Sequence, residues 1–185
     1  MMTKTLLDAS SAILLFKVGL LHELTGFYRV HVTRSVFLEL SRQNYPGADV
    51  FLNAVSNDMI KVIDVVDIPA GDITPVDALY SLDQGERDTI KCFKAGGMDL
   101  IITDDGRAAR YCKENKLPFI NALLFPRLLY FAGCISWEES TMKMDDIIDF
   151  GRHAPQIIEW ARNCRKETLA FAIPLLDAHL EFIRG

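Results

Sequence analysis

The segment Asp99–Asn121, DLIITDDGRAARYCKENKLPFIN, contains the clearest secondary-structure pattern of this chain. Its apolar run Leu100–Ile102 predicts a central strand that is covered on both faces. A helix is predicted for Gly106–Asn115, and a second short strand for Pro118–Ile120. A strand, a helix and another strand in this order are typical of an α/β fold with a mostly parallel sheet.

The flanking sequence repeats this alternation. Short β-branched or apolar runs predict five strands in all, at Lys4–Leu7, Tyr28–Thr33, Ile60–Val66, Asp99–Thr103 and Pro118–Ile120. Helical patterns lie between them, at Ser10–Thr25, Ser35–Gln43, Ala48–Ser56, Pro75–Leu82, Gly85–Ala95 and Gly106–Asn115. We therefore expect an α/β fold around a mostly parallel, five-stranded sheet.

The character of the sequence changes after Gly133. Residues 136–150 are polar and acidic, Ala154–Phe171 has helical spacing, and Pro174 precedes a last predicted short helix at Leu175–Ile183. We divide the chain into a domain at residues 1–135 and a C-terminal helical extension at residues 136–185. Folding of this extension back on the sheet and pairing with another chain are both open.

Composition narrows the functional classes. With 185 residues, 50% hydrophobic and 24% charged, the chain is globular and long enough to bury a core. The net charge of −5 excludes a surface that is basic overall, so any site for a polyanion must be local. Widely spaced cysteines without a C-x-x-C pair indicate a reducing compartment: Cys92, Cys112, Cys134 and Cys164.

Two apolar stretches do not qualify as membrane spans. Ser11–Leu21 contains a lysine and is followed by no small-residue cleavage site. Leu117–Ile135 is interrupted by prolines, an asparagine and an arginine. The sequence therefore predicts a soluble, cytoplasmic protein that does not bind a membrane.

Four acidic residues stand where a predicted strand ends or a core-facing helix begins: Asp8, Glu39, Glu86 and Asp104. An ionised carboxylate near an apolar core must be paired or must bind a cation, because its desolvation is costly. A shared divalent metal ion explains all four with one ligand. Because all the candidate donors are oxygen atoms, Mg²⁺ or Mn²⁺ is favoured over zinc.

Each of these carboxylates also has a structural explanation. Asp8 follows a predicted strand and could be the N-cap of the next helix. Glu86 could close a capping box with Asp83, and its neighbour Asp88 is predicted to point almost the opposite way. Glu39 borders an apolar stripe and could equally be a paired surface residue.

Asp104 is the strongest single candidate. It closes the buried strand, and Asp105 is the better N-cap for the helix that follows, which leaves Asp104 to point into the crevice at the sheet edge. Thr103 can add a hydroxyl that holds a carboxylate or a bound water. The histidines are scattered and are interpreted as ordinary surface or core residues: His22, His31, His153 and His179.

Basic residues lie on the helices beside these acids. Arg87 follows Glu86, and Arg107 and Arg110 lie on the helix that leaves Asp104. Such residues could bind backbone phosphates near a metal site. The alternative is a solvated helix surface that balances acidic residues elsewhere.

The sequence resembles a PIN domain, the nuclease fold of the VapC-type toxins of toxin–antitoxin systems. The matching pieces, within about residues 4–130, are TLLDASSAILLFKVGLL, TRSVFLEL, LDQGERDTIKCF and the strand-turn-helix DLIITDDGRAARYCKENKLPFIN. The resemblance implies a three-layer α/β/α fold with a five-stranded parallel sheet, dependence on Mg²⁺ or Mn²⁺, and cleavage of RNA. It also implies that Asp8, Glu39, Glu86 and Asp104 form the acidic quartet, supported by Ser10 and Thr103.

We therefore expect a metal-dependent endoribonuclease, the toxin of a toxin–antitoxin pair, with an antitoxin protein as partner and a homodimer as a possible assembly. Many PIN domains have an Asp nearer the next apolar residue at the third acidic position, so Asp88 is an alternative to Glu86. A second hypothesis is an inactive PIN-like module that binds RNA or protein. A phosphoacceptor receiver domain is disfavoured, because its paired acids follow the first strand, whereas here the pair is Asp104–Asp105.

Overall fold

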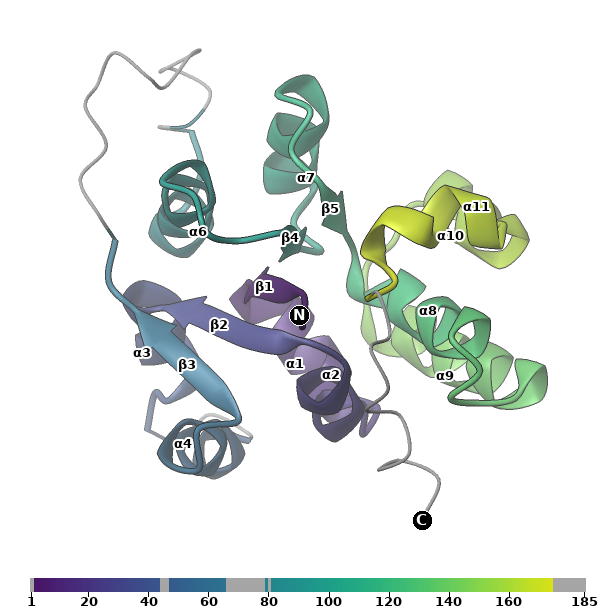
Figure 1. The fold of residues 1–185 in the computed structure, drawn as a ribbon, viewed down its shortest axis with the longest axis horizontal. Coiled ribbons are helices and arrows are strands. Elements are labelled where there is room, and N and C mark those ends of the chain that lie inside the picture. Colours follow the sequence, from purple (N-terminus) through teal and green to yellow (C-terminus); the bar gives the residue numbers. More distant parts are fainter. Residues whose placement is uncertain (1, 44–46, 66–78, 80, 175–185) are drawn as a thin grey trace.

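The computed structural model describes residues 2–43, 47–65, 79 and 81–174. Its centre is a five-stranded sheet in the order β3-β2-β1-β4-β5, and every pair of neighbouring strands is parallel (Figure 1). The strands are β1 (Lys4–Leu7), β2 (Arg29–Thr33), β3 (Ile60–Ile63), β4 (Leu100–Ile102) and β5 (Phe119–Ile120). The predicted α/β fold with a five-stranded parallel sheet is confirmed.

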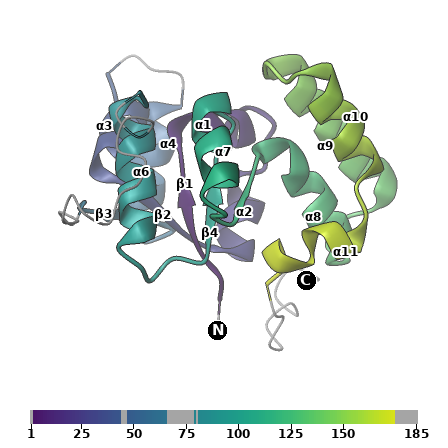
Figure 2. The same cartoon turned by 90° about the horizontal axis from the view of Figure 1, so that it is seen from above.

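Helices cover both faces of this sheet (Figure 2). In the first part of the chain they are α1 (Ala9–Lys17), α2 (Leu21–Phe27), α3 (Arg34–Leu40), α4 (Ala48–Ser56), α6 (Gln84–Lys94) and α7 (Gly106–Glu114). The later helices are α8 (Phe125–Phe131), α9 (Trp137–Phe150), α10 (Pro155–Asn163) and α11 (Lys166–Leu169), with short 3₁₀ turns at Ala122–Leu124 and Ala170–Ala172.

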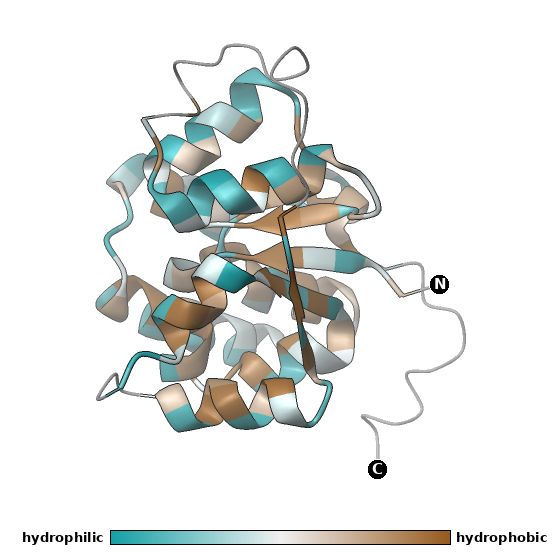
Figure 3. Ribbon diagram, turned by 90° about the vertical axis from the view of Figure 1, so that its left-hand side faces the viewer, coloured by the Kyte–Doolittle hydropathy of each residue, from teal (hydrophilic) through white to brown (hydrophobic). Residues whose placement is uncertain are grey.

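Strand β4 shows why both faces need cover. Ile101 packs with residues of α6 and α7 in a smaller core cluster, whereas Leu100 and Ile102 belong to the main cluster on the opposite face. Alternate residues of a strand point to opposite faces, so a continuous apolar run buries both sides. In Figure 3 the strands are correspondingly hydrophobic, and the nearest helix presents a mostly hydrophilic outer side.

Two predicted helices are interrupted in the structure. The single helix expected at Ser10–Thr25 is wrong: α1 and α2 are separated at Gly19, whose φ of +69° lies in the left-handed region that glycine favours. The helical segment at Ala154–Phe171 is also divided, here because the backbone of Cys164 and Arg165 is extended between α10 and α11. The helix expected at Leu175–Ile183 and most of that at Pro75–Leu82 lie outside the described residues.

The C-terminal helices fold back on the main core. Met144 and Ile147 of α9 have no exposed surface and belong to the same cluster as the sheet residues. The hydroxyl of Tyr28 donates a 2.6 Å hydrogen bond to the carbonyl oxygen of Ala172, which ties the end of the described chain to the start of β2. The division of the chain at residue 135 stays a prediction. In the described part of the chain, no helix has the length and apolar character needed to cross a membrane.

Candidate functional site

Strand order brings two of the acidic residues together. The chain runs from β1 outward to β2 and β3 and then returns to place β4 on the other side of β1. Leu7 is in register with Ile102, and the amide of Asp8 donates a 3.1 Å hydrogen bond to the carbonyl of Ile102. Asp8 and Asp104 therefore leave the carboxyl ends of adjacent strands, at the switch point where open α/β sheets bind ligands.

Asp8 is buried and fully hydrogen-bonded. It is the N-cap of α1, as the capping alternative predicted, and Oδ1 accepts hydrogen bonds from the Ser11 amide at 2.7 Å and the Ser10 hydroxyl at 3.0 Å. The hydroxyl of Thr103 donates to Oδ2. Desolvation, and then the nearby charge of Asp104, raise the pKa of Asp8 to about 6 despite these bonds.

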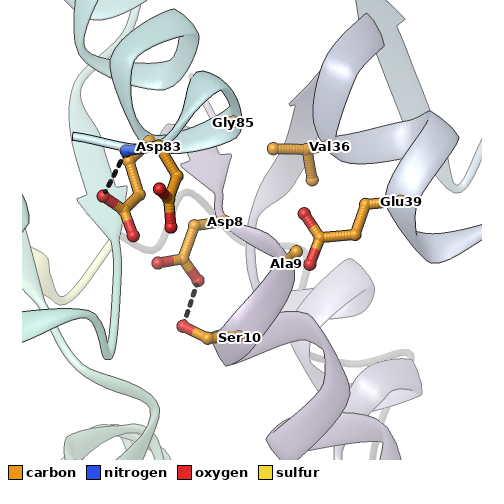
Figure 4. A pocket seen from close by; sticks show the side chains of 8 residues that line it. Asp8, Ala9, Ser10, Val36, Glu39, Asp83 and Gly85 are labelled. Atoms are coloured by element: carbon orange, nitrogen blue, oxygen red, sulfur yellow. Dashed lines mark hydrogen bonds between the residues drawn. The ribbon is translucent and has the colours of Figure 1, made fainter. Parts of the chain in front are cut away.

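Asp8 and two other members of the acidic quartet line one small cavity of about 90 Å³ (Figure 4). Its lining comes from the ends of β1, α3 and α6 and consists of Asp8, Ala9, Ser10, Val36, Glu39, Asp83, Gly85 and Glu86. The volume equals that of about three liquid waters, so the cavity suits a hydrated ion rather than an organic ligand. Gly85 permits the close approach of α6 to α3, because a Cβ there would lie 3.3 Å from Val36 Cγ2.

Glu86 heads α6 and serves two structural roles. Its Oε2 accepts a 3.1 Å hydrogen bond from the amide of Asp83, which is the predicted capping box, and Oε1 lies 3.6 Å from a guanidinium nitrogen of Arg107. Desolvation first, and then the charge of Asp105, raise the pKa of Glu86 to about 7. Asp88 does not line the cavity, whereas Asp83, expected only as a cap, does.

Asp104 lies outside the small cavity and is held by three donors. Its Oδ2 accepts from the Ser11 hydroxyl at 2.7 Å and the Ala122 amide at 2.9 Å, and its Oδ1 lies 2.9 Å from Nε2 of His153. The expected N-cap role of Asp105 is present, with hydrogen bonds from the amides of Arg107 and Ala108. Asp104 faces a second cavity, which shares Ser10 with the first.

Sequence reasoning missed His153 because nothing in its spacing relates it to Asp104, 49 positions earlier. Both side chains are buried, with 6% and 5% of their surface exposed. A carboxylate only accepts hydrogen bonds, so Nε2 of His153 carries the proton that it donates to Asp104. The sequence, which predicted an ordinary surface or core histidine, did not indicate this contact with a candidate site residue.

The three basic candidates differ in position. Arg107 contacts two acids that line the acidic cavity, with a 2.9 Å ion pair to Asp83 and the longer contact to Glu86. A guanidinium nitrogen of Arg87 donates to the carbonyl oxygen of Leu82 at 2.9 Å, so this arginine braces the start of its own helix. Arg110 is exposed on α7.

The donor atoms of this site fit a hard divalent cation in chemistry. They are carboxylate and hydroxyl oxygens, and a cation would favour the ionised forms of Asp8 and Glu86 that desolvation disfavours. Among residues 2–43, 47–65, 79 and 81–174, however, no three acidic, histidine or cysteine side chains stand close enough to hold one ion. The carboxylates would have to converge on an ion to bind it.

Comparison with known proteins identifies one family. A family model described as a PIN domain matches residues 4–157, which is well over half of the chain. No curated protein and no solved structure matches the chain.

Proposed function

This chain belongs to the PIN domain family, and on that premise we propose that it is a Mg²⁺- or Mn²⁺-dependent endoribonuclease that acts as the toxin of a toxin–antitoxin pair. One observation carries the proposal. Carboxylates from three separate elements, Asp8, Glu39 and Glu86, line one small cavity, and Asp104 lines the adjoining cavity, which shares Ser10 with it. Oxygen-rich cavities of this size suit a hydrated Mg²⁺ or Mn²⁺.

The roles of the residues follow from their surroundings. Asp8, Glu39 and Glu86, which line the cavity, would hold the metal, with Asp104 as the fourth carboxylate. Ser10 and Thr103 orient Asp8 through their hydroxyl groups. When bound, a divalent cation lowers the pKa of water and stabilises the negative charge that develops on a phosphodiester during hydrolysis.

Electrostatics explains why such a site would need a cation. An unmetallated cluster of carboxylates repels the phosphates of RNA, and the protein as a whole carries a net charge of −5. Arg107 supplies positive charge beside Glu86, where it could bind a phosphate adjacent to the scissile one. Arg87 and Arg110 are weaker candidates, because the first binds backbone and the second lies farther along α7.

Two partner predictions accompany this function. A cognate antitoxin would block the acidic cavity by inserting a basic side chain that pairs with Glu86 and Asp83, as Arg107 does within the chain. A homodimer and a cytoplasmic location are further expectations that belong with this class of protein.

Cleavage of RNA with and without divalent metal tests the proposal. Wild type should cut single-stranded RNA with Mg²⁺ or Mn²⁺ and should stop when EDTA is added. The double variant Asp8→Asn/Asp104→Asn should be inactive, whereas Asp88→Asn, on α6 but outside the cavity, should behave like wild type. Equal activity of the wild type and the double variant would overturn the assignment.

The second candidate is an inactive PIN-like binding module. It is favoured by the absence, among the described residues, of three potential ligands already placed around one ion. This alternative predicts no change of the thermal midpoint with Mg²⁺ or Mn²⁺, and RNA or protein binding that survives loss of the acidic residues.

A further inference from the structure

A second cavity of about 290 Å³ opens beside the acidic one. It lies between α1 and the end of α9, and its lining consists of Ser10, Ile13, Leu14, Lys17, Asp104, Asp105, Phe150, Gly151, Arg152 and His153. Ser10 and Asp104 connect it to the proposed metal site. Its volume is about three times that of the acidic cavity. This is close to the volume of the smallest sites that bind organic ligands.

An aromatic ring and two cations stand at this cavity. Phe150 lines the cavity and exposes 54% of its surface, so one side of its ring is open to a ligand. The Nζ of Lys17 lies 5.6 Å from the centre of the Phe150 ring, and Arg152 is exposed two residues farther on. A ring and two cations that line the same cavity match the two parts of a nucleotide, since the base stacks on the ring and the cations attract the phosphate.

The segment Phe150–His153 is anchored rather than free to swing. His153 is bound to Asp104 at 2.9 Å, and its ring packs against Gly151. A Cβ on Gly151 would lie 2.9 Å from the backbone oxygen of Ile147 and in collision with the imidazole of His153, although its φ of −95° suits any residue. Glycine is therefore required there for close packing, and this packing places Phe150 and Arg152 beside the acidic site.

We propose that this second cavity is a binding subsite for one unstacked nucleotide of single-stranded RNA, with the base on Phe150 and the phosphate near Lys17 and Arg152. The substrate class rests on the proposed nuclease function. A nucleotide held here lies next to Asp104, so its neighbour in the strand is delivered to the acidic cavity. A protein helix is a poorer occupant, because charged and polar side chains, among them Lys17, Asp104 and Arg152, make up most of the lining beside Ile13 and Leu14.

Binding measured without metal tests this subsite separately from cleavage. The affinity of a short, labelled single-stranded RNA is measured by fluorescence anisotropy in EDTA for wild type and variants. Phe150→Ala should weaken binding by about 5- to 100-fold, the usual loss for one stacked base. Phe150→Trp should retain the affinity, and Arg152→Gln should lower the dependence of log affinity on log salt by about one.

The matched control is Phe171→Ala, which removes an equally exposed phenylalanine (57%) that does not line this cavity. A second probe, an abasic RNA backbone, should bind wild type and Phe150→Ala equally, because it offers no base to stack. Thermal unfolding of each variant checks that the fold is intact.

The outcomes distinguish the two proposals. If wild type cleaves RNA with Mg²⁺ but Phe150→Ala binds RNA as tightly as wild type, the subsite is refuted and the nuclease function stands. If Phe150→Ala loses affinity and no metal supports cleavage, the subsite stands and the chain is an RNA-binding module. If wild type does not bind RNA in EDTA, the subsite is refuted and Phe150 is left available for a protein partner.

Discussion

Asp104 and His153 lie 2.9 Å apart although 49 positions separate them, one just after β4 and the other after α9. Through this contact the segment Phe150–His153 forms one wall of the second cavity. It also occupies one oxygen of Asp104, while the Ser11 hydroxyl and the Ala122 amide occupy the other. The C-terminal helices thus contribute to the site as well as to the core.

Substitution of Gly151 by alanine should disturb that wall. The added methyl group would collide with the Ile147 carbonyl and the His153 ring, so the segment must shift and His153 must leave Asp104. We expect a lower thermal midpoint and weaker binding of single-stranded RNA in EDTA. The control is Gly133→Ser, at a site with open space around the added Cβ but a strained φ of +77°, which should destabilise the protein without altering RNA affinity. An unchanged RNA affinity in Gly151→Ala would contradict the role of this wall.

Replacement of Asp8 by asparagine should stabilise the fold and abolish cleavage. Burial raises the pKa of Asp8 from 3.8 to about 6, so the folded protein keeps a proton that the unfolded chain releases as the pH rises through this window. The free energy of unfolding of wild type therefore falls between pH 4 and pH 6, by at most about 3 kcal/mol, and stays lower above it. In Asp8→Asn the free energy of unfolding should not fall in this way, because asparagine carries no ionisable proton.

Urea unfolding at pH 4 and pH 8 measures the difference. The two proteins should be similar at pH 4, and Asp8→Asn should be more stable at pH 8. A wild type that gains stability from pH 4 to pH 6 relative to Asp8→Asn would show that the hydrogen bonds to Asp8 outweigh its desolvation.

Glu86 and Asp88 should differ in metal binding. Glu86 lines the acidic cavity and Asp88 does not, so only Glu86→Gln should lose the stabilisation by divalent cations. A ligand at 100 times its dissociation constant stabilises the folded state by about 2.7 kcal/mol, which is readily seen as a rise in the thermal midpoint. The thermal midpoint of each variant is compared in Mn²⁺ and in EDTA. If Mn²⁺ raises the midpoint of Glu86→Gln but not that of Asp88→Asn, Asp88 rather than Glu86 is the metal ligand.

Arg107 should set the acid limb of the pH–rate profile. Its positive charge lowers the pKa of Glu86, which desolvation raises to about 7. Removal of that charge in Arg107→Gln should therefore shift the acid limb of single-turnover cleavage to higher pH, since Glu86 must ionise to bind a cation. Arg107→Lys keeps the positive charge and should therefore show a profile close to that of wild type. Arg110→Gln, on the exposed side of α7, should leave the profile unchanged.

Arg127 should be essential for the packing of α8 against α9. Its side chain is 2% exposed, its guanidinium lies 3.7 Å from the ring centre of Trp137, and it donates to the hydroxyls of Ser140 and Thr141. Arg127→Ala removes this packing and leaves Ser140 without its donor, so we expect a loss of about 3 kcal/mol in urea unfolding. Arg127→Met keeps the volume and should lose much less. Equal stability of wild type and Arg127→Ala would contradict the tight packing of these helices.

Local patterns were sufficient for the strands and for most helix starts before residue 115, but they did not predict α8 or α9. The apolar run Leu100–Ile102 predicted a two-faced strand, and Asp105 before Gly106 predicted an N-cap, because both depend on residues within one or two turns of each other. The same patterns predicted one helix where the structure has two, because the apolar sequence continues through Gly19, at which a left-handed residue separates α1 from α2.

Convergence of the acids was only partly foreseeable. The rule that parallel strands bind ligands at their carboxyl ends brings Asp8 to Asp104, but it does not say which other side chains complete the site. Packing of α6 against α3 decided that Glu39, Asp83 and Glu86 share one cavity. The return of the chain after α9 decided that His153 binds Asp104. Contacts of this kind depend on the angles at which helices cross the sheet, and such angles follow from the whole set of packed side chains rather than from any local sequence.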